Sequence, residues 1–234
     1  MLSEFSLHHQ PNFMQQPLWK KILSYVYEFH IESIYSDINK TLHVSLSQGR
    51  YQLSTQNAIY SFGDLYSNYH KAFEQIDFDK HKIESVLLLG FGLGSIPLML
   101  EQNFQQNFQY TGVEIDESVI YLAEKYVTNE LNSPIDIFTA DALTFVKICE
   151  EQFDMICVDI FLDDIIPEDF QQQDFLKSVK RLLSNDGIVL YNRLALTDAD
   201  KEASEAFLTE RFLPVFPKGS FIDVDGNWMF TNLE

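Results

Sequence analysis

Cysteines, basic residues and long apolar runs are scarce in this sequence of 234 residues. Its two cysteines, Cys149 and Cys157, have neither metal-ligand spacing nor the density of a disulfide framework, so we expect buried thiols in a reducing compartment. Nowhere do about 18 apolar residues follow one another, as a membrane-spanning helix requires, and no basic segment leads an apolar one near the start. These absences predict a cytoplasmic protein.

Basic residues are outnumbered by acidic ones: 16 Lys and Arg stand against 35 Asp and Glu, a formal net charge of −19. Such a charge repels phosphate backbones and anionic lipid surfaces. We therefore expect no nucleic acid and no membrane as partner, and a neutral or cationic small molecule as substrate. Because no Cys, His and Asp cluster has ligand spacing, we also expect no metal.

The rest of the composition, 46% hydrophobic and 14% aromatic, is enough for one sizeable core with a small appendage. We divide the chain into an N-terminal arm with a short helix (1–24), a small antiparallel β domain (25–62) and an α/β domain (63–234). The arm begins polar and rich in glutamine. Its adjacent His8 and His9 fit a solvated tail better than a metal site, since no third ligand is nearby.

Alternating apolar residues mark the β domain. They occupy every second position in three runs: Tyr25, Tyr27, Phe29 and Ile31; Leu42, Val44 and Leu46; Tyr51 and Leu53. Turn signals at Asn39-Lys40 and Gln48-Gly49 separate the runs. The pattern predicts an antiparallel meander of three or four strands over residues 25–60, which needs a packing partner to be stable.

Helices are expected on both sides of the meander. Pro17 starts a helical turn over residues 17–24, and Asp64 is the expected N-cap of the helix that follows the meander. The apolar residues of that second helix lie at helical spacing: Leu65, Tyr66, Tyr69 and Phe73.

Beyond residue 84, strand and helix patterns alternate, which predicts a doubly wound α/β sheet. The expected strands cover residues 86–89, 110–115, 135–139, 153–160 and 187–192. The expected helices cover residues 95–101, 118–130, 142–149, 170–183 and 199–211. A reversed, hairpin-like edge is expected from three final short strands, 212–216, 221–224 and 228–231.

The first of these strands runs directly into a glycine loop, Val-Leu-Leu-Leu-Gly-Phe-Gly-Leu-Gly over residues 86–94. Glycines let the backbone turn sharply and approach a ligand closely. Ser95 lies near the N-cap of the next helix and Pro97 in its first turn, so the helix N-terminus points at an anion. The alternative is a buried strand with a glycine-rich turn and no ligand.

Carboxylates follow the next strands, at the edge where open α/β sheets bind ligands. Glu114 can accept hydrogen bonds from ribose hydroxyls, or it is a surface acid. Asp141, between the small Ala140 and Ala142, can meet an exocyclic purine amine, although a helix N-cap explains it almost as well. Asp159 ends an apolar strand, where its carboxylate needs a ligand, a backbone cap or a basic group.

Together these motifs resemble the S-adenosylmethionine-dependent methyltransferase fold and, within it, the spermidine synthase-like branch. The matching segments are residues 86–94, 113–123, 141–142, 153–159 and 182–192. The resemblance implies a Rossmann-like sheet with an antiparallel last strand. The β-meander with Tyr69-His70 after it resembles the N-terminal domain of aminopropyltransferases, in which the meander makes a dimer contact, so a homodimer is an option here.

The resemblance also implies a cofactor, S-adenosylmethionine or its decarboxylated form. The implied cofactor-binding residues are Gly90, Phe91, Gly92, Gly94, Glu114, Ile115, Asp141, Ala142 and Asp159. Asp159, Asp163 and Tyr69 are the candidate catalytic residues, with Asp164 as a further candidate base, and Tyr69 and His70 are expected to reach over the site from a lid.

Four positions depart from the aminopropyltransferase pattern. Leu93 stands where an Asp holds the aminopropyl amine. Leu162 stands where a second Asp deprotonates the attacking amine, and Asp163 comes one place late. Tyr60 replaces a Gln that contacts the nucleoside, and Lys71 stands where an acid helps to bind a polyamine. Because a misplaced base cannot reach its proton, these departures favour another transferase reaction.

The leading hypothesis is therefore a small-molecule methyltransferase whose glycine loop and helix N-terminus receive the methionine carboxylate. The first alternative is aminopropyl transfer to a polyamine with Asp163 as a displaced base. The second is a catalytically inactive binding or scaffold protein, whose pocket would be filled by side chains such as Phe91, Leu93 or Phe161. The acceptor is not identified by the sequence.

Overall fold

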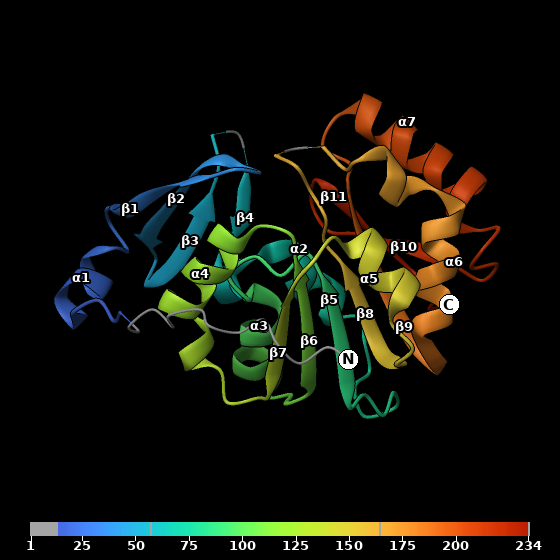
Figure 1. Cartoon of the computed structure of the whole chain (residues 1–234), viewed down its shortest axis with the longest axis horizontal. Helices are drawn as coiled ribbons and strands as arrows, with labels where there is room; N and C mark the ends of the chain where they lie inside the picture. Colours follow the sequence, from blue (N-terminus) through green and yellow to red (C-terminus); the bar gives the residue numbers. More distant parts are fainter. Residues whose placement is uncertain (1–13, 57, 164, 234) are drawn as a thin grey trace.

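The protein consists of a small antiparallel sheet followed by a larger mixed sheet (Figure 1). The structure, a computed structural model, describes residues 14–56, 58–163 and 165–233. The predicted arm up to residue 13, with His8 and His9, lies outside these ranges, as does Asp164. Within the described ranges, no helix is both long and apolar enough to cross a bilayer.

The small sheet confirms the predicted meander. After α1 (Leu18–Leu23), its strands follow one another in the order of the chain, each antiparallel to the next: β1 (Phe29–Ser36), β2 (Lys40–Ser47), β3 (Arg50–Ser54) and β4 (Ile59–Ser61). Lys40, Gln48 and Gly49 have positive φ at the expected turns.

The first strand begins later than its apolar alternation predicts. The backbone N–H groups of Val26 and Tyr27 donate to the Leu23 carbonyl, so this segment continues the last turn of α1. Tyr25 and Tyr27 are exposed. The prediction of a strand from Tyr25 is wrong because the carbonyls that end a helix take these amides first.

Two short helical segments, η1 (Gly63–Leu65) and α2 (Ser67–Phe73), join the sheets. The predicted Asp64 N-cap is wrong, because Tyr66 precedes α2 and Asp64 instead accepts two bonds from Arg50 on β3, at 2.5 Å from Nε and 2.8 Å from Nη2. Hydrogen bonding to Arg50 lowers the pKa of Asp64. This bidentate pair, in which Asp64 is buried and Arg50 half-buried, fixes η1 against the meander.

The large sheet has seven strands in the order β10-β11-β9-β8-β5-β6-β7. Its strands are β5 (Ser85–Leu89), β6 (Gln109–Glu114), β7 (Ile135–Thr139), β8 (Phe153–Val158), β9 (Leu183–Leu194), β10 (Ser220–Asp223) and β11 (Asn227–Thr231). The five from β9 to β7 are parallel, whereas β11 and β10 are antiparallel. The Rossmann-like sheet with a reversed edge is thus confirmed.

The helices that cover this sheet are α3 (Ser95–Phe104), α4 (Glu117–Tyr126), α5 (Ala142–Ile148), α6 (Gln173–Leu182) and α7 (Asp198–Phe207), with shorter segments η2 (Thr128–Glu130), η3 (Glu168–Gln171) and η4 (Leu208–Phe212). The strand predicted at 212–216 is wrong. That segment forms helical turns instead, because the Phe216 N–H donates to the Phe212 carbonyl. The centroids of the two phenylalanine rings lie 4.8 Å apart.

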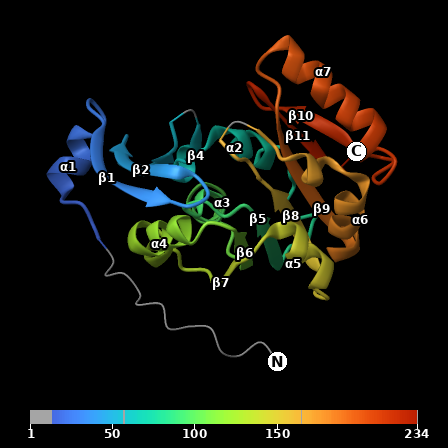
Figure 2. The ribbon, with the colours of Figure 1, turned by 45° about the horizontal axis from the view of Figure 1, so that its top comes forward.

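Helices lie on both faces of the large sheet (Figures 1 and 2). Val86 and Leu88 of β5 pack into a hydrophobic cluster with α3 and α4, whereas Leu87 and Leu89 pack into a second cluster with α5, α6 and α7. Buried apolar side chains on both faces explain why β5 reads as a continuous apolar run. The meander packs into the first cluster, and the domain boundary at residue 62 stays a prediction.

Candidate functional site

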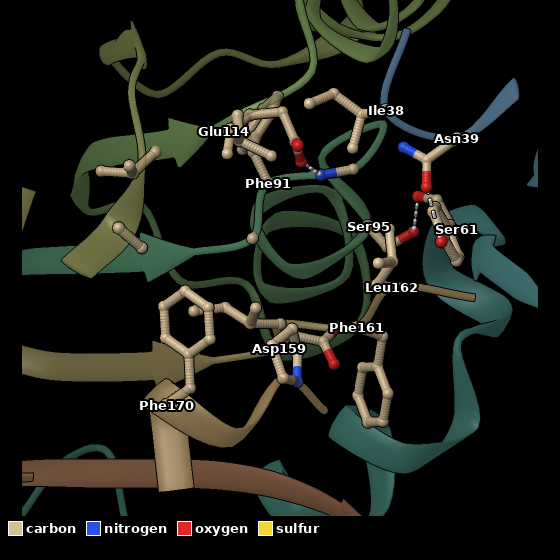
Figure 3. Close-up of a pocket in the computed structure, with 18 of the residues that line it drawn as sticks. Ile38, Asn39, Ser61, Phe91, Ser95, Glu114, Asp159, Phe161, Leu162 and Phe170 are labelled. Atoms are coloured by element: carbon tan, nitrogen blue, oxygen red, sulfur yellow. Dashed lines mark hydrogen bonds between the residues drawn. The ribbon is translucent and has the colours of Figure 1, made fainter. Parts of the chain in front are cut away.

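A pocket of about 240 Å³ opens at the carboxyl ends of β5, β6 and β8, with the meander along one side (Figure 3). This is the edge where open α/β sheets bind ligands. The lining comes from the glycine loop, the ends of three strands, the segment after β8 and the meander: Ile38, Asn39, Ile59, Tyr60, Ser61, Tyr66, Gly90, Phe91, Gly92, Ser95, Ile96, Val113, Glu114, Ile115, Ala140, Asp141, Ala142, Asp159, Ile160, Phe161, Leu162, Pro167 and Phe170.

Most of the residues singled out from the sequence meet in this pocket. Those that line it are Gly90, Phe91, Gly92, Glu114, Ile115, Asp141, Ala142 and Asp159. Gly94 is not a lining residue and is the left-handed N-cap of α3. Of the three candidate catalytic residues, Asp159 alone is among the lining residues; Asp163 and Tyr69 are not.

The glycine loop is shaped by its neighbours. A Cβ on Gly90, which has φ +87°, would overlap the backbone carbonyl of Asp159. Three of the loop's N–H groups are already used: Gly90 donates to the Val113 carbonyl, Gly92 to Glu114 at 3.2 Å and Leu93 to Ser61 Oγ at 3.2 Å. At these three positions a ligand carboxylate would compete with protein acceptors.

The start of α3 is fastened to the meander through two serines. Ser95 Oγ lies 2.5 Å from Ser61 Oγ and accepts the N–H of Phe62 at 3.0 Å. Both serines are buried. These bonds hold the glycine loop and β4 together along one wall of the pocket.

Glu114 ends β6 as a half-buried wall of the pocket. Its Oε2 accepts the Gly92 N–H, and its Oε1 accepts the Asp116 N–H at 3.1 Å. Burial raises the pKa of Glu114 against the opposing effect of these two amides. The carboxylate is thus placed beside the glycine loop rather than on the open surface.

Asp141 both lines the pocket and caps α5. Its carboxylate accepts the N–H groups of Leu143 and Thr144, at 3.1 and 3.3 Å, and the Thr144 hydroxyl. The capping interpretation left open by the sequence is therefore observed. The small side chains of the neighbouring Ala140 and Ala142 also line the pocket.

Asp159 follows β8 and is half-buried. Its Oδ1 accepts the Asn192 side-chain amide at 2.9 Å and the Tyr66 hydroxyl at 3.3 Å, and Asn227 Nδ2 in turn donates to Asn192 Oδ1 at 2.8 Å. Within the described part of the chain, no donor reaches Oδ2. Burial raises the pKa of Asp159 to about 6, against the effect of the two hydrogen bonds.

Tyr69 is fully buried, and its hydroxyl donates to the Val158 carbonyl at 3.1 Å. The expected lid of Tyr69 and His70 is wrong, because the His70 ring packs against Phe104 instead. The neighbouring Tyr66, which the sequence marked only as an apolar helix position, is the tyrosine that lines the pocket.

Asp163 is not among the residues that line the pocket. It has φ +58°, its N–H donates to the Tyr60 hydroxyl at 2.5 Å, and its Oδ1 accepts Thr55 Oγ1 at 2.6 Å. Leu93 is buried in the first hydrophobic cluster, and Lys71 pairs with Asp225. None of Asp163, Leu93 and Lys71 lines the pocket.

A series of hydrogen bonds crosses from the large sheet to the meander and back. Asn39 donates from Nδ2 to Asp116 at 2.7 Å and accepts the Tyr60 hydroxyl at 2.8 Å, and Tyr60 accepts the Asp163 N–H. Burial raises the pKa of Tyr60 to about 12. Asn39 carried only a turn signal in the sequence, which gives no hint of partners 77 residues away.

Comparison with known proteins gives relatives of two kinds. A probable polyamine aminopropyl transferase of Bifidobacterium longum (strain NCC 2705) is 28% identical over 141 residues, 60% of this chain and 31% of that protein. The polyamine aminopropyltransferase of Vibrio vulnificus (strain CMCP6) is 32% identical over 114 residues, 47% and 38% of the two chains. An eEF1A lysine and N-terminal methyltransferase of Bos taurus is 29% identical over 119 residues, 46% and 17%. The chain thus spans well under half the length of these relatives.

Solved structures show the same fold. The spermidine synthase of Thermotoga maritima matches with a TM-score of 0.65 at 18% identity, over 87% of this chain and 72% of that one. Human methyltransferase-like protein 13, in complex with SAH, matches with a TM-score of 0.57 at 22% identity, over 70% and 81%. The spermine/spermidine synthase domain matches residues 68–206, more than half of the sequence, and the chain therefore belongs to that family.

Proposed function

We propose that the pocket binds S-adenosylmethionine and that the protein transfers its methyl group to a small molecule. One observation carries the proposal: the glycine loop and the acids after β6, β7 and β8 line a single pocket at the ligand-binding edge of the sheet. Family membership supports the same cofactor chemistry. Human methyltransferase-like protein 13 was solved with SAH, and a spermidine synthase was solved with the transition-state analogue AdoDATO.

The lining residues fit an adenosyl group. Glu114 has a half-buried carboxylate with a raised pKa, which ribose hydroxyls would stabilise as donors. Ala140 and Ala142 leave a flat space for a purine, and Asp141 has acceptor atoms beside it. Phe91 and Phe170 add apolar surface that excludes water from the pocket.

The cofactor would supply an electrophilic methyl group on a sulfonium. The chain's own contribution is to hold the acceptor in line and to remove its proton. Asp159 suits the second task, because its pKa of about 6 leaves it ionised at neutral pH and Oδ2 is open to a ligand. Asn192 and Tyr66 fix the carboxylate through Oδ1.

Methyl transfer is favoured over aminopropyl transfer by two positions. Leu93 is buried in the core, so it offers no counter-charge to the lone amine of a decarboxylated cofactor. Asp163, the displaced base of the alternative, accepts a hydrogen bond from Thr55 and is not a lining residue of the pocket. The names of the bacterial relatives keep polyamine aminopropyl transfer as the second candidate.

An inactive binding or scaffold protein is less well supported. That hypothesis predicts a pocket filled by Phe91, Leu93 or Phe161. Leu93 instead packs into the core, and although Phe91 and Phe161 line the pocket, a cavity lined by three acids remains open between the walls.

Calorimetry of the purified protein with S-adenosylmethionine and with its decarboxylated form tests the cofactor. We expect the carboxylate-bearing form to bind more tightly. Tighter binding of the decarboxylated form would instead favour the aminopropyl alternative. If neither compound binds at millimolar concentration, the proposed function is rejected.

Three variants test the roles of Glu114 and Asp141 in cofactor binding. Glu114→Gln should weaken S-adenosylmethionine binding about tenfold, since hydrogen bonds to a charged group contribute about 1.5 to 3 kcal/mol. Asp141→Ser keeps an N-cap for α5, so it should weaken binding without lowering the unfolding temperature, whereas Asp141→Ala should lower both. Asp174→Asn, exposed on α6, is the control for the loss of one negative charge. Unchanged affinity in Glu114→Gln would contradict the assignment.

A further inference from the structure

We propose that the acceptor is a monoamine with an apolar body, bound with its single amino group at Asp159; this inference rests on the proposed transfer reaction. It follows from where the acidic and the apolar side chains lie in the pocket.

The described lining residues include three acids and no Lys, Arg or His. Glu114 uses both carboxylate oxygens on the amides of Gly92 and Asp116. Asp141 uses both on the first turn of α5. Within the described residues, Asp159 Oδ2 is therefore the carboxylate oxygen of this pocket that has no protein donor.

Apolar residues that follow Asp159 in the chain, Ile160, Phe161 and Leu162, line the pocket beside it. Figure 3 shows Phe161 and Leu162 beside Asp159, with Leu162 on the side towards Ser61. Leu162 is 48% exposed and Ile59 is 51% exposed, so both present apolar surface where the pocket meets solvent. An aliphatic or aromatic body extending outward from Asp159 would cover these side chains and gain hydrophobic contact.

Among the described residues that line the pocket, a second ammonium group would find no acid besides Glu114, Asp141 and Asp159. Asp163, the next described carboxylate in the chain, is not a lining residue, and its Oδ1 accepts Thr55 Oγ1. A second ammonium held against this apolar wall would lose part of its hydration without gaining a charge partner, so a diamine would lose more on entering the pocket than a monoamine of the same length. The net charge of −19 still attracts a single cation towards the protein.

Hexylamine and hexane-1,6-diamine form a matched pair of probes, because they differ only in the second amino group. Their binding is measured by calorimetry at pH 8, on the free protein and on protein saturated with SAH. We expect hexylamine to bind at least about tenfold more tightly in both cases. Equal binding, tighter binding of the diamine, or no binding of either amine would overturn the inference.

Two substitutions of Leu162 distinguish the effect of a charge on amine binding from the effect of side-chain shape. Leu162→Asp places a carboxylate on the apolar wall and should shift the preference towards the diamine by at least about fivefold, as expected for a new charge pair. Leu162→Asn, of similar size and neutral, should not produce this shift. Because the side chain is half exposed, both variants should fold, which circular dichroism checks. The same shift in both variants would overturn the inference.

The SAH titration in the same samples distinguishes the two proposals. Binding of SAH without a preference for the monoamine would overturn the acceptor assignment and leave the proposed cofactor in place. Absence of SAH binding would reject the proposed function, and the acceptor role of the amine with it.

Discussion

Three features of the structure act on the carboxylate of Asp159. It follows an apolar strand, it is half-buried, and its Oδ1 is held by Asn192 and Tyr66. Asn227 fixes which end of the Asn192 amide faces the acid, because its Nδ2 donates to Asn192 Oδ1. Burial dominates the balance and raises the pKa of Asp159 to about 6, so the acid titrates just below neutral pH.

Asp159 should therefore make the folded protein less stable as pH rises. An unfolded Asp has a pKa of about 3.9, so between about pH 4 and pH 6 the folded state binds more protons and the free energy of unfolding falls with rising pH. Asp159→Asn removes this loss. Relative to the natural protein, the variant should gain about 1 to 3 kcal/mol on going from pH 4 to pH 7.5.

Urea unfolding of both proteins at these two pH values measures the change. Asp174→Asn, which removes an exposed charge from α6, is the control. A difference between Asp159→Asn and the natural protein that does not vary with pH would contradict the raised pKa.

The glycine loop acts as one element with the strands around it. Gly90 approaches the Asp159 backbone, and Gly94 and Gly112 leave room for the Phe91 ring. The apolar run before the loop predicted β5 correctly, because a strand covered on both faces has no polar side to reveal. The same sequence could not show that Ser61 and Glu114 accept the loop's amides, since neither is near it in the chain.

Substitutions at two glycines should differ in cost. Gly90→Ala forces a Cβ onto the Asp159 carbonyl at φ +87°, so it should reduce the free energy of unfolding by about 3 kcal/mol or more. Gly92→Ala, with φ +56° and a nearest contact of 3.4 Å, meets only the left-handed backbone strain of about 1 to 2 kcal/mol. Thermal and urea unfolding compare the two variants, and equal losses would argue against the close approach at Gly90.

On the scale of the whole molecule, the pocket belongs to both sheets. Ile38, Asn39 and Tyr60 of the meander region face Glu114 and Asp159 of the large sheet, and the Asp116–Asn39–Tyr60–Asp163 hydrogen bonds join the two. A ligand in this pocket would therefore contact both parts and stabilise their packing together.

Hydrogen exchange with and without SAH should reveal this coupling. At about 100 times its dissociation constant, SAH should add about 2.7 kcal/mol to the free energy of unfolding. Slower exchange is expected in residues 38–41 and 59–62 of the meander region as well as in residues 90–96 of the glycine loop. Protection confined to the large sheet would show that the meander does not take part in binding.

The sequence by itself determined the elements and the edge at which the site lies. Periodicity gave both sheets because it records which side chains are buried, and Glu114, Asp141 and Asp159 could be grouped because parallel strands end at one edge. Local pattern failed at Tyr25 and at 212–216, where backbone hydrogen bonds continued a helix.

The tertiary structure alone decided which side chains complete the pocket. Asn39, Tyr66 and Asn192 join Asp116 and Asp159 from positions 33 to 93 residues away, and such partners leave no periodic signal in the chain. It also turned Asp163 towards Thr55 and buried Tyr69 behind the pocket. The direction of a side chain depends on the surface packed against it, which only the folded chain supplies.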